Sequence, residues 1–248
     1  IRLESTNPPG LEAGVIEYTR QYMESRGISC SIYEKAAGRP ILVTRLDGAH
    51  PRTIVFNGHC DVVPAGDGWD TPPFEPAIRD GRLYGRGSCD MKGGLAAMLC
   101  AQLSLSEIPP EDRPNVEVHV VPDEEDHGEN GSKYLAETGL ARGDVAVFGE
   151  PTDLNVVRAH KGQLSFRVVY SGKAAHASTP ELGENAITKA VEALAGIESR
   201  FHKMHEGFEH PLLGRPTMSI GKIDGGAAGN IVPERCVVLI DRRVVPGE

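Results

Sequence analysis

The sequence predicts an α/β fold, a mostly parallel sheet flanked by helices, followed by a small α+β domain. Strand-like apolar runs and helical stretches alternate through residue 150, which is typical of a parallel sheet with helices on both faces. Three of the apolar runs end in a histidine or in acids. After about residue 160 the pattern changes to strands grouped around one long helix.

The first elements follow a proline-rich turn. Residues 5–10 (STNPPG) lead into a helix over 11–26. The β-branched and aromatic run Thr53–Asn57 predicts a buried strand. After the irregular, turn-rich segment 66–76, residues 80–87 (DGRLYGRG) predict a short hairpin.

The alternation then continues with two helices and two strands. Residues 91–107 predict a helix with two glycines near its start, and residues 115–122 predict another buried strand. Residues 131–139 predict a helix that ends in a glycine, and residues 144–151 predict a third strand.

Polar side chains follow these three strands. His59 comes after the first strand, the run Asp123–Asp126 after the second, and Glu150 ends the third. The carboxyl ends of parallel strands meet at one edge of a sheet, which is where open α/β sheets bind their ligands. We therefore expect these side chains to lie close together.

The remaining elements predict the small α+β domain. Residues 162–172, 217–226 and 234–244 predict strands, and residues 183–202 predict a long amphipathic helix. The apolar side of this helix carries Ile187, Val191, Leu194 and Ile197. No repeat or low-complexity segment occurs.

Composition excludes several classes of function. The 248 residues are 40% hydrophobic with a net charge of -9, which argues against general binding to nucleic acid or anionic membranes. No apolar run approaches the ~20 residues of a membrane span. The first residues, IRLE, have no starting Met and no leader pattern, as expected for a range that starts late. Five cysteines without a C-x-x-C pair predict reduced thiols in a cytoplasmic protein, with Cys60 and Cys89 as small filler.

Two motifs are weak when taken alone. His59 and Asp61 lie two residues apart, so their side chains project on the same side, and a carboxylate beside a metal-bound imidazole fixes its tautomer. An isolated H-x-D motif nevertheless favours a polar turn. Asp90 in GRGSCDMKGG follows a glycine-rich turn that matches no nucleotide-binding motif, and by itself it favours a helix cap.

The segment 121–131, VPDEEDHGENG, sets acids side by side after a strand. Like charges in a row repel, so the run needs solvent, disorder or a positive partner. Two adjacent acids can point apart, one toward metal ions and the other toward the water they hold. With His59, Asp90 and Glu150 they make a nitrogen and oxygen ligand set, which borderline divalent ions prefer. Taken together, these residues favour a metal site.

The same residues carry a resemblance to a known family. The sequence resembles the co-catalytic zinc amidohydrolases, which include acetylornithine deacetylase, succinyl-diaminopimelate desuccinylase, aminoacylase and glutamate carboxypeptidase. The matching segments span nearly the whole chain in family order, and GRGSCDMKGG is highly specific. They are STNPPG, NGHCDVVPAGDGWDTPPFEPAIRDGRLYGRGSCDMKGGLAAML, DEE, FGEPT, GKAAHASTPELGENAI, GNIVPERC and DRRVVPGE.

The resemblance implies a site for two divalent metal ions. Zinc is the first expectation, with cobalt or manganese as alternatives. His59 and Glu150 would hold one ion and Glu125 the other, and Asp90 would bridge both.

The resemblance also implies roles for residues around the metals. Asp61 would orient the histidine ligand, and Glu124 would be the general base. His176 would help to polarise the scissile carbonyl, from the partner subunit or on lid closure, while Asn230 and Arg242 would grip the substrate carboxylate. Without the resemblance, His176 is typical of a surface loop, Asn230 of a turn and Arg242 of a strand-end ion pair.

Other polar residues are expected to be solvated. Asp123, Asp126 and Glu129 are interpreted as solvated or capping residues. The histidines of HKMHEGFEH have near-helical spacing, and we interpret them as a solvated helix end. They are His202, His205 and His210.

The resemblance divides the chain in two. Residues 1–158 would be the N-terminal portion of the catalytic zinc-binding domain, and residues 159–248 a lid that forms a homodimer. The family's second metal has a final histidine ligand far downstream, and no histidine here follows Arg242. The chain stops at Glu248, inside the lid or just past it, so we expect the C-terminal part of the catalytic domain to be absent, in a fragment or a truncated form.

The implied function is metal-dependent hydrolysis of the amide bond in a small N-acyl amino acid, as in acetylornithine deacetylase or the desuccinylase. A dipeptidase or carboxypeptidase of the same family is an alternative. A truncated, non-catalytic dimerising protein is another, and a natural stop at residue 248 would favour it. The sequence does not determine the acyl group or the amine.

Overall fold

The computed structural model describes residues 1–248, which form two compact units. The first unit comprises Ile1–Asn155 and the second Val156–Glu248. The division lies close to the boundary predicted after residue 158. None of the helices has the length and apolar character that a membrane crossing needs.

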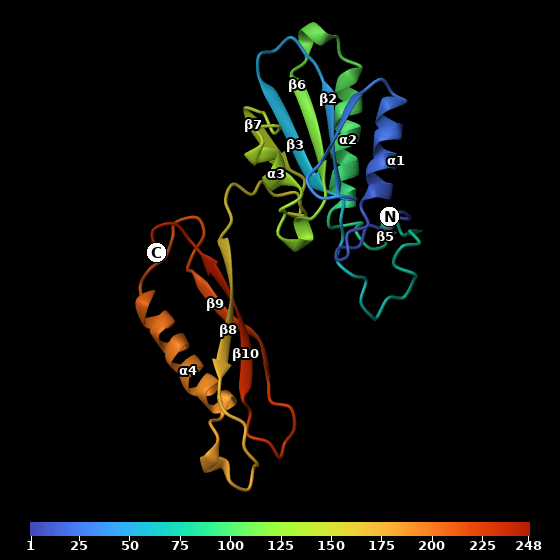
Figure 1. Cartoon of the computed structure of the whole chain (residues 1–248). Coiled ribbons are helices and arrows are strands. Elements are labelled where there is room, and N and C mark those ends of the chain that lie inside the picture. The colour runs from blue at the N-terminus through green and yellow to red at the C-terminus, as the bar shows by residue number, and fades with distance from the viewer. The chain divides into compact units, whose positions relative to one another are not determined.

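The first unit is built on a five-stranded mixed sheet (Figure 1). The strand order is β1-β2-β6-β3-β7, and β6, β3 and β7 run parallel to one another. The strands are β1 (Ser29–Glu34), β2 (Pro40–Leu46), β3 (Thr53–His59), β6 (Asn115–Val121) and β7 (Val145–Phe148). The predicted mostly parallel sheet with flanking helices is therefore confirmed, and the hairpin predicted over 80–87 corresponds to β4 (Ala77–Arg79) and β5 (Arg82–Tyr84).

Sequence reasoning assigned no structure to residues 28–52, where the fold places the hairpin of β1 and β2. These two strands pair antiparallel with each other, and β2 pairs antiparallel with β6. The strand β2 is almost entirely buried, so its run PILVTRL lacks the alternation that identifies a half-exposed strand.

Helices cover both faces of this sheet (Figure 1). The helices α1 (Ala13–Glu24) and α2 (Lys92–Ser106) lie on one face, and the short α3 (Ser132–Glu137) lies on the other. Because strand side chains alternate between faces, each face has its own apolar core. The core beneath α1 and α2 contains Val15, Ile16, Leu42, Cys60, Met91, Leu95, Met98, Val118 and Val120. The core beneath α3 contains Ile41, Val43, Val121 and Leu135.

Two close backbone approaches fix the ends of the strands. A Cβ atom on Gly94 of α2 would fall 2.1 Å from the carbonyl oxygen of Gly149, directly after β7. A Cβ atom on Gly131, before α3, would fall 2.3 Å from the carbonyl oxygen of Pro122, directly after β6. Only glycine permits such contacts, so these helices sit directly on the strand ends.

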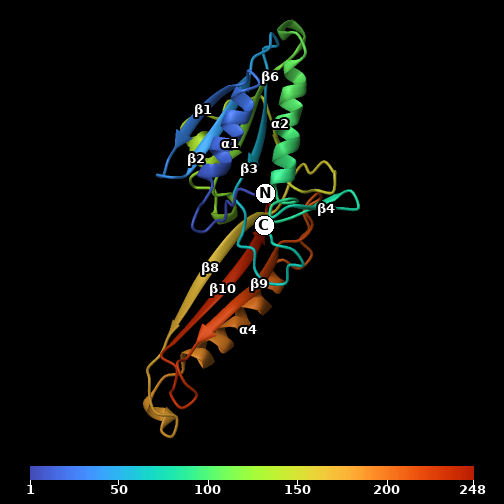
Figure 2. The ribbon, with the colours of Figure 1, turned by 90° about the vertical axis from the view of Figure 1, so that its right-hand side faces the viewer.

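The second unit is a three-stranded antiparallel sheet with one helix (Figure 2). The strands β8 (Gly162–Ser171), β9 (Thr217–Gly225) and β10 (Arg235–Val244) are arranged in the order β8-β10-β9. The helix α4 (Ala186–Met204) runs along one face of the sheet. The side chain of Asn185 caps this helix by accepting from the amides of Ile187 and Thr188.

One residue of the predicted apolar side of α4 does not belong to it. Leu194 is buried against the sheet together with Ala186 and Ala190, but Val191 is 56% exposed. Residues four apart form the row that faces the strands, and at about 100° per residue Val191 lies near the flank of that row. Small alanines, which the prediction passed over, occupy the centre of the contact.

Candidate metal centre

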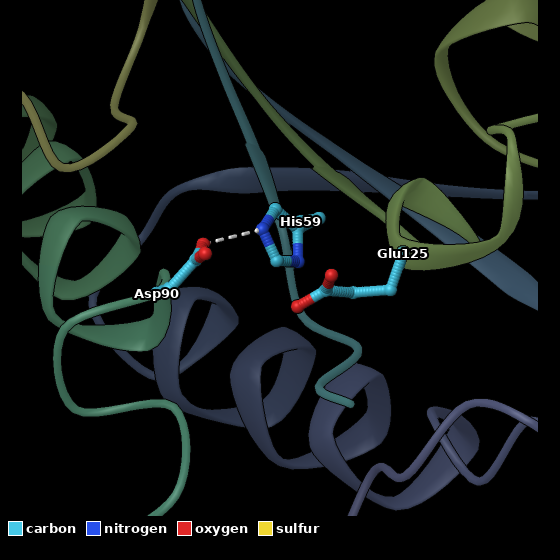
Figure 3. Close-up of side chains that lie close together, drawn as sticks. All are labelled: His59, Asp90 and Glu125. Carbon is cyan, nitrogen blue, oxygen red and sulfur yellow. Dashed lines mark hydrogen bonds and ion pairs between the residues drawn. The ribbon is translucent and has the colours of Figure 1, made fainter. Parts of the chain in front are cut away.

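Three segments of the first unit bring potential metal ligands together (Figure 3). His59 is the last residue of β3, Asp90 lies in the turn before α2, and Glu125 lies in the 3-10 turn η2 (Glu124–Asp126) after β6. One ligand atom from each lies within 4.8 Å of the other two. Asp90 and Glu125 approach the imidazole from opposite sides.

The imidazole of His59 is the centre of this group. Its Nε2 atom lies 3.1 Å from Oδ1 of Asp90, 3.8 Å from Oε2 of Glu124 and 3.9 Å from Oε1 of Glu150. Its Nδ1 atom donates to the backbone carbonyl oxygen of Asp61 at 2.9 Å. The ring therefore points Nε2 toward the carboxylates. Nε2 is the nitrogen that would bind a metal ion.

The carboxylate of Asp61 contacts both His59 and the turn that follows β6. Its Oδ1 atom lies 3.4 Å from Nδ1 of His59, and the two oxygens accept hydrogen bonds from the backbone amides of Glu124 (3.2 Å) and Glu125 (3.1 Å). Asp61 is fully buried. Asp61 thus links the predicted ligand His59 on β3 to the turn that carries the predicted base Glu124 and the predicted ligand Glu125.

The acidic turn is tightly constrained. Asp123 and His127, on either side of η2, both adopt left-handed backbone conformations, with φ of 72° and 76°. Asp123 was predicted to be solvated or capping, but it is only 2% exposed. Its carboxylate accepts from Arg39 and from Asn130, so the charge is balanced inside the protein. Asp126 and Glu129 are exposed, as predicted.

The electrostatics of the site follow from burial and from crowding of like charges. Burial favours the neutral form of His59, but the carboxylates of Asp61, Glu150 and Glu124 outweigh it and raise its pKa to about 9. Burial, reinforced by the neighbouring acids, raises the pKa of Glu125 and of Glu150. The acids are thus gathered around one positive charge.

The donor set fits a divalent metal ion. Ligand atoms bound to one ion at about 2.1 Å can be at most about 4.2 Å apart, and the Nε2 distances to Asp90 and Glu150 are 3.1 and 3.9 Å. Glu125 offers an atom within 4.8 Å of those of His59 and Asp90, so it belongs to the same group of potential ligands. One imidazole and several carboxylates are ligands that zinc and similar ions accept.

Glu124 is more exposed than its neighbour Glu125. Its side chain is 52% exposed, while its Oε2 atom lies 3.8 Å from Nε2 of His59. No residue donates a hydrogen bond to its carboxylate, whereas its backbone amide is fixed by Asp61. A carboxylate that is close to the ligands and free of partners can accept a proton from a bound water molecule.

In the second unit, His176 and Asn230 lie side by side. His176 and Ile231 form an antiparallel bridge, and the amide of Ala177 donates to the carbonyl oxygen of Asn230. The Nδ1 atom of the exposed His176 accepts from the amide of Ser178 and lies 2.7 Å from its hydroxyl. The proton is therefore assigned to Nε2, which is free to donate to a substrate oxygen.

Arg242 lies at the other end of the same sheet. It pairs with Leu164 in the strand ladder, while Arg235 pairs with Ser171, the end of β8 that leads to His176. Seven residues of strand correspond to about 23 Å. Within one copy of this unit, Asn230 and Arg242 therefore do not come together, and their shared role on one carboxylate stays a prediction.

Arg242 has partners of its own. Its Nη2 atom donates to Oε1 of Glu248 at 2.8 Å and lies 3.2 Å from Nε2 of His205, and its guanidinium lies 4.9 Å above the ring of Phe201. His205 was predicted to be part of a solvated helix end without an acid, but it is half-buried and lies 3.6 Å from Glu248. The sole group of three potential ligands in the chain is the one around His59.

Sequence reasoning missed the residues that support the site. Asn7, Glu12 and Arg39 are buried or nearly buried behind the acidic turn. Asn7 contacts Asp61 and Asp123, Arg39 contacts Asp123, and Glu12 contacts Arg39. Asn7 belongs to STNPPG, a segment that we matched to the family without giving its residues a role. Arg39 precedes β2, in the region to which no structure was assigned.

Comparisons with known proteins identify the family of this chain. A family model described as "Peptidase family M20/M25/M40" matches residues 55–233. An acetylornithine deacetylase from Pectobacterium carotovorum is 36% identical over 197 residues, which are 78% of this chain and 51% of that protein. The chain thus spans about half the length of this relative.

Solved structures share the fold. An M20 family metallo-carboxypeptidase from Sulfolobus solfataricus matches with a TM-score of 0.78 at 19% identity, over 100% of this chain and 70% of the other. A dinuclear metal-binding peptidase of the M20 family from Bacillus subtilis matches with a TM-score of 0.62 at 17% identity, over 98% of this chain and 61% of the other. At these identities the similarity establishes the fold alone.

Proposed function

Because the chain belongs to peptidase family M20/M25/M40, we propose that it forms part of a metal-dependent hydrolase that cleaves the amide bond of an N-acyl amino acid. The observation that carries the proposal is the gathering of Asp90, Glu124 and Glu150 around the Nε2 atom of His59, with Glu125 in the same group of potential ligands. A site of this composition suits hydrolysis better than binding alone, since one of its acids is free to move protons.

The predicted ligands have separate tasks in this proposal. His59 and Glu150 would hold one divalent ion, Glu125 would hold another, and Asp90 would serve both. When bound, such ions polarise a carbonyl group and lower the pKa of a bound water molecule toward ~7. Zinc is the ion we propose first, because its preferred ligands are those of this site.

Glu124 acts as the general base. It takes the proton from the attacking water and returns it to the nitrogen of the leaving amine, so one residue serves both steps. Its exposed carboxylate, 3.8 Å from Nε2 of His59, supports this role. Asp61 holds the amides of Glu124 and Glu125, which keeps the base and the ligand in a fixed relation.

His176 donates to the oxygen of the scissile carbonyl as negative charge develops on it. The hydrogen bonds at its Nδ1 atom support this role, since they leave the Nε2 proton available. An oxyanion donor of this kind contributes roughly 3 kcal/mol to transition-state binding. Asn230, beside His176, is proposed to bind the substrate carboxylate.

Homodimerisation through the second unit is part of the proposal. Its sheet leaves one edge of β8 and one edge of β9 unpaired, and such edges can pair with another chain. A dimer would also let Asn230 of one copy and Arg242 of another serve the same substrate, which a single copy does not allow.

The proposed substrate rests on the deacetylase relative, which is 36% identical. A dipeptidase or carboxypeptidase is the second candidate, because the matching family model is described as a peptidase family. The two differ in the group on the acyl side of the amide bond, so turnover of matched substrates separates them.

The test measures bound metal and turnover on the same samples, with N-acetyl, N-succinyl and dipeptide substrates. We expect divalent metal in the protein and the highest kcat/KM on an N-acyl amino acid. Faster turnover of dipeptides would favour the second candidate. Metal binding without turnover of any substrate would favour a non-catalytic dimerising protein, and absence of metal binding would overturn the proposal.

A further inference from the structure

A buried chain of ion pairs lies behind the turn that carries Glu124 and Glu125. The guanidinium of Arg39 contacts the carboxylate of Glu12, and its Nη1 atom lies 2.9 Å from Oδ1 of Asp123. The side chains of Glu12 and Asp123 are 0% and 3% exposed, and that of Arg39 is 15% exposed. Water therefore screens these contacts little, and charge-assisted hydrogen bonds of this kind hold their partners firmly.

Asp123 connects this arginine to both ends of the acidic turn. Its second carboxylate oxygen accepts from the backbone amide of Asn130 at 3.0 Å and from the side-chain amide of Asn130 at 2.8 Å. Its own backbone, in the left-handed conformation, begins the turn. The segment between residues 123 and 130 is thereby closed into a loop by a single side chain.

Asn7 connects Asp123 to the site itself. Its Nδ2 atom donates to Oδ2 of Asp61 at 2.9 Å and lies 3.4 Å from Oδ1 of Asp123. The carboxylate of Asp61 in turn accepts the amides of Glu124 and Glu125. A continuous set of contacts therefore runs from Arg39 to the predicted ligand.

The role of Arg39 in this set of contacts follows from the charges of the buried carboxylates around it. Glu12, Asp61 and Asp123 are three buried carboxylates, and they lie beside the acids that surround His59. An arginine is charged at every pH of interest and presents several donors in a fixed plane, so it can hold two acids in one geometry. Without it, Asp123 would keep a buried charge with only neutral donors, and the loop that it closes would shift toward solvent.

We infer that Arg39 is a positioning residue of the metal centre, which acts through Asp123 to set the turn so that Glu125 joins His59 and Asp90 in the group of potential ligands. The inference rests on the proposed metal site. Residues that orient metal ligands typically change metal affinity by 10- to 100-fold when they are replaced. Arg39 is expected to fall in this range although it touches none of the predicted ligands.

The test is a titration of the chain with Co²⁺, followed by visible absorption and by competition with a chelator. The variants are Arg39→Met and Asp123→Asn. Arg45→Met is the control, because the more exposed Arg45 also pairs with a buried carboxylate of the first unit, that of Glu117 at 2.7 Å. Thermal unfolding of each metal-free variant shows how far stability alone has changed.

We expect Arg39→Met and Asp123→Asn to bind Co²⁺ at least 10-fold more weakly than the wild type and to change the absorption spectrum. Arg45→Met should lower the unfolding temperature while the affinity and the spectrum stay as in the wild type. Asp123→Asn keeps the size of the side chain. Both carboxylate oxygens of Asp123 accept hydrogen bonds, and the substitution replaces one of them with an NH₂ group, which cannot accept. It therefore decides the matter if Arg39→Met does not fold.

Two results would overturn the inference. The first is wild-type affinity and spectrum in both site variants. The second is an equal loss of affinity in Arg39→Met and Arg45→Met, which would reflect general destabilisation. A wild-type chain that binds no Co²⁺ is a separate outcome, because it would remove the proposed metal site and this inference with it.

Discussion

The two units differ in whether the fold brings their predicted site residues together. In the first unit, four separate segments contribute residues that meet around the imidazole of His59. These residues are His59 itself, Asp90, Glu125 and Glu150. In the second unit, residues expected to grip one substrate lie at opposite ends of one small sheet.

The direction of the strands explains this difference. Parallel strands place their carboxyl ends at the same edge, so residues that follow β3, β6 and β7 meet there. Antiparallel strands place the end of one beside the start of the next. Arg242, near the end of β10, therefore lies far from Asn230, which precedes β10 and lies beside the segment that follows β8. Strand polarity decides whether residues at strand ends can share a site.

The largest expected effect concerns the convergent site. We expect Glu124→Gln to reduce turnover by roughly 10³-fold, since a general base contributes 10²- to 10⁴-fold. Metal content should not change, because the proposed ligand is Glu125. Steady-state kinetics and metal analysis of the same sample measure both quantities.

The control for Glu124→Gln is Asp126→Asn in the same turn, where an exposed acid is neutralised. Its turnover should stay near that of the wild type. If Glu124→Gln loses metal and Glu125→Gln keeps it, the two glutamates have exchanged roles. Near-normal turnover of Glu124→Gln would refute the base assignment.

The next effect concerns how rigidly each unit holds its elements. We expect Gly94→Ala to lower the free energy of unfolding of the first unit by about 3 kcal/mol or more, the upper end of what overpacking costs. The reason is that its Cβ atom would lie 2.1 Å from the carbonyl oxygen of Gly149, beside Glu150. Chemical denaturation of the chain measures this change.

The same substitution in the second unit is the control. Gly196 of α4 has nothing within 4 Å of its would-be Cβ atom. There, Gly196→Ala should raise stability by about 0.5–1 kcal/mol, since alanine is the better helix former. Equal effects at the two glycines would contradict the close contact between α2 and the end of β7.

A pH dependence is expected from the first unit. The folded pKa of His59 is raised from 6.5 to about 9, so the folded chain binds this proton more tightly than the unfolded chain. The resulting stability is fully present below about pH 6.5 and is lost as the pH rises through 9. The full shift corresponds to at most about 3 kcal/mol.

Thermal unfolding of the metal-free chain between pH 6 and pH 10 tests this expectation. Stability should fall across the window in the wild type, and the slope should be much smaller in His59→Gln. An identical slope in the two proteins would show that the acids around His59 do not hold its proton.

The predicted and the missed residues differ for a physical reason. His59, Glu125 and Glu150 could be placed because each follows an apolar run, and parallel strands bring such ends together. Arg39 could not be placed, because its partners depend on the hairpin of β1 and β2, whose buried strand shows no alternation. Asp123 was interpreted as solvated or capping because its counter-ion is 84 residues away along the chain, at Arg39.

The smallest expected effect concerns the second unit. Arg242 was predicted to bind substrate, but its guanidinium pairs with Glu248 and lies over Phe201. We expect Arg242→Met to lower the stability of the second unit by about 1 kcal/mol, as for a half-buried ion pair with a cation–π contact. Chemical denaturation measures the stability of the variant, and steady-state kinetics on the same sample measure its KM.

Arg243→Met provides the comparison, because Arg243 is half-exposed and pairs only with Asp241 on its own strand at 2.8 Å. Its stability should change by less than about 0.5 kcal/mol. A raised KM in Arg242→Met, measured beside stability, would support the proposed role of Arg242 as a substrate contact. Since Asn230 lies about a strand length away, that result would require residues from two copies of the chain at one site.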